Sequence, residues 1–66
     1  MDRQLAEDTK RTAEGIVETM KLMNSCGDPY NVYGTLIRTL HTLSDIHKKA
    51  VGTALILTDD YKIEEA

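Results

Sequence analysis

Apolar and small side chains recur every three or four residues between residues 2 and 24, which is the spacing of one face of an α-helix. Charged residues occupy most of the other positions in this segment. We therefore expect a first helix from about Asp2 to Met23 or Asn24. Leu22 falls away from the apolar stripe and is expected to be exposed. The stripe consists of Leu5, Thr9, Ala13, Ile16, Met20 and Met23, with Ala6, Thr12 and Val17 beside it.

A second helical pattern extends from Pro29 to about Leu57. Its apolar arc covers roughly half of the helix circumference, which is wider than the roughly 100° stripe of an ordinary surface helix. A single partner helix cannot cover so wide an arc, so the pattern favours a further contact, most simply with a second copy of the chain. The arc consists of Leu36, Leu40, Leu43, His47, Ala50, Ala54 and Leu57, with Tyr33, Ile37, Ile46, Val51 and Leu55 on its two sides.

Two alternatives concern this second segment. Thr42-Leu43-Ser44-Asp45 resembles a helix start, so in one alternative the helix bends or breaks near Ser44. Ala54-Leu55-Ile56-Leu57 also fits a short buried strand. A strand needs a partner strand, and we identify none elsewhere in the chain, so we favour one long helix.

The short connection Cys26-Gly27-Asp28-Pro29 contains residues that end one helix and begin another. Glycine suits the left-handed residue after a helix, aspartate suits the N-cap and proline suits the first helical position. The sequence therefore predicts an all-α fold, an antiparallel helical hairpin of two long helices that dimerises into a four-helix bundle. We expect a single hairpin domain over residues 1–58 and an acidic tail over residues 59–66.

The size of the chain supports the expectation of a dimer. With 66 residues, no Trp and no Phe, the core is small, and small scaffolds usually need a disulfide, a metal or oligomerisation. One Cys forms no internal disulfide. A single Cys and polar residues after Met1 fit a cytoplasmic protein, and the absence of a long apolar run predicts no membrane association.

The net charge of −3 is placed unevenly along the sequence. Acidic and basic residues balance over residues 1–58, whereas the tail contains Asp59, Asp60, Glu64 and Glu65 against Lys62 alone. A neutral body argues against strong non-specific binding to nucleic acid, which needs an excess of cations. The tail is either a docking arm or a frayed terminus.

A modest basic strip lies on the polar side of the second helix and is our candidate partner-binding surface. It is a docking surface for a phosphate or an acidic partner, or else a solvated face in which Asp45 pairs with Lys48 or Lys49. Two glycines on the same side favour the close approach of a partner. The strip consists of Gly34, Arg38, His41, Asp45, Lys48, Lys49 and Gly52.

Other candidate chemistry is sparse. His47 lies at the centre of the apolar face, where we expect a packed side chain bonded to a Thr, Tyr or backbone group rather than a pH-sensitive or ligand-binding residue. Cys26 has no neighbouring base, and Cys26, His41 and His47 lack the spacing of a metal site. We expect no cofactor, no metal and no enzymatic activity.

In form, the pattern is similar to small helical-hairpin regulators that dimerise into four-helix bundles, such as the plasmid copy-number RNA-binding modulators, with no shared motif. We expect a small non-enzymatic regulatory or adaptor protein that acts through protein–protein contacts as a homo-oligomer, most simply a dimer. One alternative is an RNA- or DNA-binding modulator that uses the basic strip. Another is a small enzyme or ligand-binding protein with a site between subunits.

Overall fold

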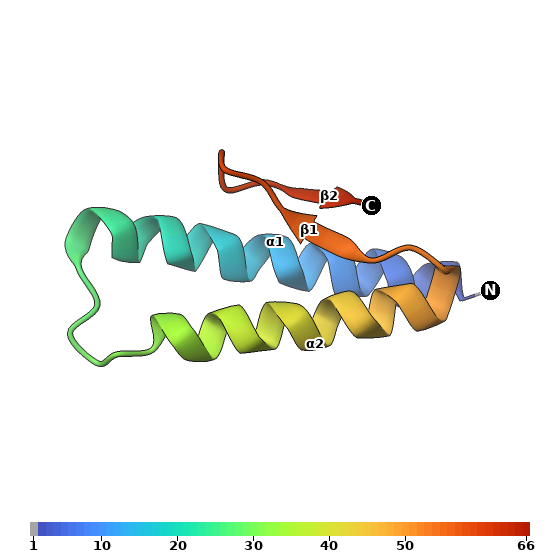
Figure 1. The fold of residues 1–66 in the computed structure, drawn as a ribbon, viewed down its shortest axis with the longest axis horizontal. Helices are drawn as coiled ribbons and strands as arrows, with labels where there is room; N and C mark the ends of the chain where they lie inside the picture. The colour runs from blue at the N-terminus through green and yellow to red at the C-terminus, as the bar shows by residue number, and fades with distance from the viewer. Residues whose placement is uncertain (1) are drawn as a thin grey trace.

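The structure, a computed structural model, describes residues 2–66 as two helices followed by a small β-hairpin. Helices α1 (Arg3–Cys26) and α2 (Tyr33–Val51) lie antiparallel and side by side (Figure 1). Strands β1 (Leu55–Leu57) and β2 (Ile63–Glu65) then cross one face of the helix pair on the side of α1. The predicted helical hairpin is confirmed. The prediction that the fold is purely α-helical is wrong, because the C-terminal residues form a sheet.

Helix α1 buries only part of the predicted stripe, because Leu5 is 43% exposed and Ile16 and Met23 are half-buried. The Asp2 carboxylate caps its start by accepting a hydrogen bond from the Leu5 N–H at 2.9 Å. Gly27, with φ of 90°, follows the last residue, and its N–H donates to the Met23 carbonyl at 2.7 Å. The buried face consists of Ala6, Thr9, Ala13, Val17 and Met20.

The Asp28 carboxylate caps the second helix as expected, but it lies further from the first helical residue in the sequence than an N-cap residue does. Its carboxylate accepts hydrogen bonds from the backbone N–H groups of Val32 and Tyr33, each at 2.9 Å. These are donors that the first turn of a helix leaves unpaired. Helix α2 therefore starts at Tyr33, four residues after the predicted first residue, Pro29.

Helix α2 ends earlier than the sequence predicts. Gly52 adopts the left-handed conformation with φ of 88°, and its N–H donates to the Lys48 carbonyl at 2.7 Å. The helix ends there because the left-handed residue turns the chain away from the helix axis. The predicted continuation to Leu57 is therefore wrong. Helix α2 also runs through Ser44 without the alternative break.

The β-hairpin uses residues assigned above to a helix and to a tail. Strands β1 and β2 pair antiparallel with Ile56 opposite Glu64, so the partner strand that seemed absent lies within residues 59–66. Leu55 and Ile63 are buried. They complete the core with Ala13, Val17, Met20 and Leu40. Part of the wide apolar arc of α2 is thus covered by the chain's own hairpin, across the expected boundary at residue 58.

The other face of the helix pair stays uncovered, and we call its apolar residues Leu5, Ile46 and Ala50 the back surface. They line a shallow hollow together with Asp2 and Lys49. Leu5 is 43% exposed. On α1 it lies on the flank opposite to Lys10, whose ammonium group contacts β2 through Glu65. Over residues 2–66, neither helix combines the length and the apolar character needed to span a bilayer.

Candidate functional site

A hollow lies between α2 and β1, and we call it the α2–β1 groove. Its volume is about 520 Å³. The hairpin lies over α1, and β1 is the strand nearer to α2 (Figure 1). Core residues form an apolar floor, and His41 and Asp45 stand on the α2 side. The groove is lined by Ala13, Ile37, Leu40, His41, Ser44, Asp45, Leu55, Ile56, Leu57 and Ile63.

The free edge of β1 forms one wall of this groove. Backbone bonds from Ala66 to Ala54 and from Thr58 to Lys62 flank the sheet, so Ile56 and Glu64 form the hydrogen-bonded pair between them. The N–H and C=O groups of Leu55 and Leu57 must then point away from β2. Ser44 satisfies those of Leu55, with both hydrogen bonds at 3.0 Å. Across residues 2–66, no hydrogen bond uses those of Leu57.

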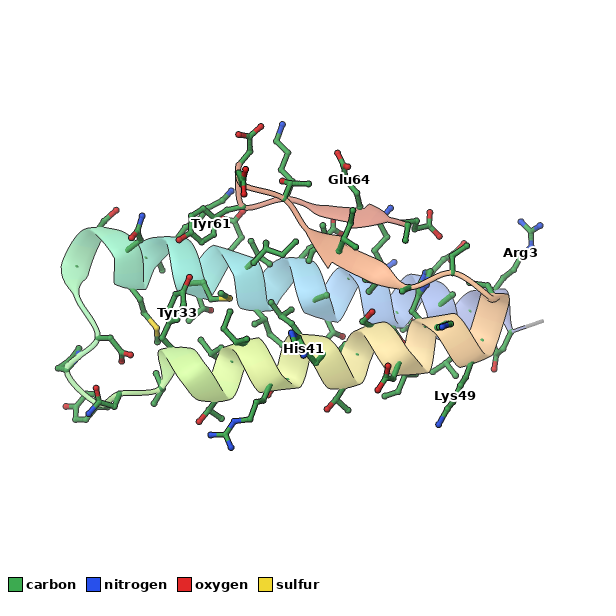
Figure 2. All side chains as sticks on the ribbon, viewed as in Figure 1. Arg3, Tyr33, His41, Lys49, Tyr61 and Glu64 are labelled. Atoms are coloured by element: carbon green, nitrogen blue, oxygen red, sulfur yellow. The ribbon has the colours of Figure 1, made fainter. Side chains whose placement is uncertain are left out.

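Two polar contacts tie α2 to the hairpin on either side of the free part of the edge. One is the contact between Ser44 and Leu55. The other joins the hydroxyl oxygens of Tyr33, on the first turn of α2, and Tyr61, beyond β1, at 3.2 Å (Figure 2). This hydrogen bond raises the pKa of Tyr33, with desolvation and the proximity of the Tyr61 charge adding to it. These two contacts therefore fix the position of β1 relative to α2 at both ends of the groove.

The predicted basic strip is exposed along its whole length, but its members face different surfaces. His41 and Asp45 line the α2–β1 groove. Lys49 instead borders the back surface and points away from the hairpin (Figure 2). Among the ion pairs of residues 2–66, none involves Asp45, Arg38 or Lys48, so the expected pairing of Asp45 along the helix is not observed.

The two glycines of the strip have different explanations. Gly52 is not inside a helix, because it is the left-handed residue that ends α2. That conformation accounts for a glycine without any partner. Gly34 lies within the first turn of α2 and has no atom within 4 Å of the position that a Cβ would take. Only Gly34 therefore still supports the close approach of a partner.

His47 is 1% exposed and joins the helix to both ends of the hairpin segment. Its Nδ1 lies 2.5 Å from the Thr53 carbonyl oxygen and its Nε2 lies 3.3 Å from Glu65 Oε1. The carbonyl needs a donor, so Nδ1 carries a proton, and Nε2 donates to the carboxylate only when the ring is protonated. Lys10 approaches the other oxygen of Glu65 at 3.8 Å. The expectation of a packed, backbone-bonded His47 is confirmed.

The remaining candidates are not brought together. Cys26 is the last residue of α1, exposed and far along the chain from either His. The hydroxyl of Ser44, one turn before His47, is engaged with Leu55. No group of three metal-ligating side chains occurs among residues 2–66.

The α2 wall of the groove was predictable from the sequence, and the β1 wall was not. His41 and Asp45 followed from the helical period, whereas the wall formed by Leu55–Leu57 depended on the hairpin. A signal was present, because the turn-forming residues Thr58-Asp59-Asp60 separate an apolar run from Ile63.

No family model matches this chain, and neither the search of curated proteins nor that of solved structures finds a match. The function is therefore inferred from the surfaces of this chain alone.

Proposed function

We propose that this chain is a small non-enzymatic regulatory or adaptor protein that works through contacts with other protein chains. The observation that carries the proposal is the α2–β1 groove, where an apolar floor meets unpaired backbone groups at Leu57. Such a groove accepts an apolar anchor from a short segment of a partner, and the strand edge offers it main-chain hydrogen bonds. The side chains of Ile56 and Leu57 are themselves exposed beside it.

Charged groups on α2 add selectivity to this docking surface. Asp45 and His41 line the groove, and Arg38 and Lys48 are exposed on the same helix without an ion pair in the part of the chain that is described. Exposed charges contribute little to folding but affect the rate of association and the choice of partner. A cytoplasmic location belongs to the proposal, because the thiol of Cys26 is free and exposed.

Association of the chain with itself is also part of the proposal. The back surface supports a dimer with four packed helices, because Leu5, Ile46 and Ala50 lie there without a covering element. A core of this size gains stability from burying such a face against a second copy. Sedimentation at micromolar concentration is expected to give a mass above that of the 7.4 kDa chain. A well-folded monomer at that concentration would remove self-association from the proposal.

The groove is tested by selecting binders from a displayed library of random peptides. The selected sequences are then synthesised as peptides and titrated against the chain. Ile37→Glu places a charge on the groove wall, and Leu22→Glu places the same charge on an exposed site of α1. Binding is expected to weaken at least about tenfold in Ile37→Glu, since burying one large aliphatic side chain is worth about 1.5–3 kcal/mol. Leu22→Glu is the matched control and should bind as the unmodified chain does.

Circular dichroism of both variants establishes that the helices are retained. Peptides that bind equally to the unmodified chain and to Ile37→Glu would show that the groove is not the docking site. The double reversal Arg38→Glu with Lys48→Glu then examines the strip, and it should alter which peptides are selected while leaving helicity unchanged.

An RNA- or DNA-binding modulator is the second candidate function. The observation that favours it is the exposure of Arg38, Lys48 and Lys49, none of which forms an ion pair among residues 2–66. Phosphate contacts of this kind give a binding constant that falls steeply with salt. Titration with a generic RNA hairpin at several salt concentrations decides the point. Salt-dependent binding that the double reversal abolishes would support this candidate over the adaptor.

A further inference from the structure

The outer edge of β2 is an unpaired strand edge that the proposed groove does not use. In the register of the hairpin, Ile56 bonds to Glu64, so the backbone groups of Ile63 and Glu65 point away from β1. Within residues 2–66, no hydrogen bond ends on those outward groups. An open edge of this kind is a template for pairing with another strand.

Among residues 2–66, no other helix or strand pairs with this edge. Strand β2 lies at the outer side of α1, away from α2 (Figure 1). A hollow of about 370 Å³ lies beside the contact between α1 and β2, and residues of both elements line it. The hollow leaves room for a further strand along β2. Val17 and Ile63 are buried at its base, and Glu14, Glu18 and Lys21 line its α1 side.

The outer face of β2 carries one positively charged and one negatively charged side chain. Lys62 and Glu64 are two residues apart, so both point to the face of the sheet away from the helices. Figure 2 shows the Glu64 side chain directed outward, away from α1 and α2. Both residues are exposed, and neither forms an ion pair in the described part of the chain.

We infer that the occupant of this edge is β2 of a second copy of the chain, paired antiparallel about Ile63. In this register Ile63 hydrogen-bonds to Ile63 of the other copy, and Lys62 of each copy lies directly opposite Glu64 of the other. The two-fold symmetry produces this complementary pair twice. Opposite charges directly across two strands stabilise their pairing. The product is a continuous four-stranded sheet with order β1-β2-β2-β1.

The charges also select the register. A neighbouring antiparallel register that keeps Ile63 hydrogen-bonded is centred on Glu64, and it places the two Glu64 carboxylates directly opposite each other. The neighbouring register centred on Lys62 likewise places the two Lys62 ammonium groups opposite each other. Like charges directly opposite each other are destabilising. The register centred on Ile63 has attraction where these two registers have repulsion, so it is the one we assign.

This inference deepens the self-association included in the proposed function, and it does not depend on the back surface. The first experiment is a charge swap measured by sedimentation over a concentration series. Lys62→Glu alone and Glu64→Lys alone each create two repulsive pairs and should weaken dimerisation about tenfold. The double variant Lys62→Glu with Glu64→Lys restores both pairs in reversed order and should recover the affinity of the unmodified chain.

Disulfide trapping tests the register directly, in a Cys26→Ser background that removes the native thiol. Lys62→Cys and Glu64→Cys chains, one of them tagged, are mixed and oxidised. Residues opposite each other in a non-hydrogen-bonded pair have Cα atoms about 4.5 Å apart, which a disulfide can span. The mixture should therefore give the mixed disulfide, and each variant alone should give little. Efficient cross-linking of Glu64→Cys alone would overturn the assigned register.

Two further outcomes separate this inference from the proposed function. A dimer that is insensitive to the charge swap but lost in Ile46→Glu would place the contact on the back surface, overturning the inference while keeping self-association. A folded monomer in sedimentation, with no mixed disulfide, would overturn both. Circular dichroism of every variant shows whether the fold is retained, and Arg38→Glu on α2 serves as a charge-matched control for Lys62→Glu away from β2.

Discussion

The Ser44 hydroxyl accepts a hydrogen bond from the Leu55 N–H and donates one to the Leu55 carbonyl, both at 3.0 Å. One side chain on α2 thus pairs both backbone groups that a neighbouring strand would otherwise pair. The contact closes part of the free edge of β1 and leaves only Leu57 available beside the groove. It also fixes where the hairpin meets the helix.

Ser44→Ala should destabilise the fold by about 1–3 kcal/mol. The substitution leaves the N–H and C=O of Leu55, a buried residue, without partners, and unmade hydrogen bonds of buried groups carry the cost of their desolvation. Urea unfolding followed by circular dichroism measures the loss. Thr42→Ala is the control, because the Thr42 hydroxyl donates only to the Arg38 carbonyl of its own helix and is exposed. Equal losses of stability at the two positions would show that the contact between Ser44 and Leu55 does not stabilise the fold.

The helices were predictable because each carries a long periodic signal, whereas the only signal of the hairpin was the group of turn-forming residues after Leu57. Strands of three residues are too short to show a period, and Ala54–Leu57 continues the apolar phase of α2. Gly52 was the informative residue. Its place on the polar side of the helical wheel made it look like part of a docking strip, whereas its backbone conformation ends the helix. The groove could not be predicted without the hairpin that forms its second wall.

Leu40→Ala should cost about 2–5 kcal/mol, the range observed when a buried Leu is truncated in a packed core. Leu40 is 8% exposed and contacts the cluster that joins both helices to the hairpin. Leu22→Ala should change stability by less than about 0.5 kcal/mol, because Leu22 is 66% exposed on α1. Chemical denaturation of both variants measures the difference. Comparable losses would mean that the assigned helix faces are wrong.

The contact between Tyr33 and Tyr61 should make stability depend on pH in the alkaline range. The pKa of Tyr33 is raised in the folded chain, so the folded state holds its proton more tightly than the unfolded state. The stabilisation is complete below the ordinary tyrosine pKa of about 10 and is lost as the pH rises through the raised value. Alkaline titration followed by phenolate absorbance should show one tyrosine titrating late.

Tyr61→Phe provides the matched comparison for that titration. It removes the hydroxyl partner but keeps the ring, so the pKa of Tyr33 should fall toward its ordinary value. The stability difference between the unmodified chain and Tyr61→Phe should shrink as the pH is raised. A late-titrating tyrosine that persists in Tyr61→Phe would contradict the assignment.

The two glycines near the ends of α2 should respond to alanine in opposite directions. Gly52→Ala forces a Cβ into a left-handed conformation with φ of 88° and should destabilise by about 1–2 kcal/mol. Gly34→Ala lies in a helix with open space around the new Cβ and should stabilise by up to about 1 kcal/mol. Thermal unfolding of the pair compares them directly. A loss of stability in Gly34→Ala would show that this site depends on the absence of a side chain.

The attachment of the hairpin has a consequence for how the chain folds and moves. A two-stranded hairpin is marginal on its own in water, so β1 and β2 become ordered only on a preformed helix surface. The hairpin is joined to α2 through residues 52–54, and Gly52 at the start of that segment is the natural hinge. We therefore expect helix packing to precede hairpin docking during folding. We expect any opening in which the hairpin lifts from the helices to break the contacts of His47, Ser44 and Tyr33 with it, and to uncover Leu40.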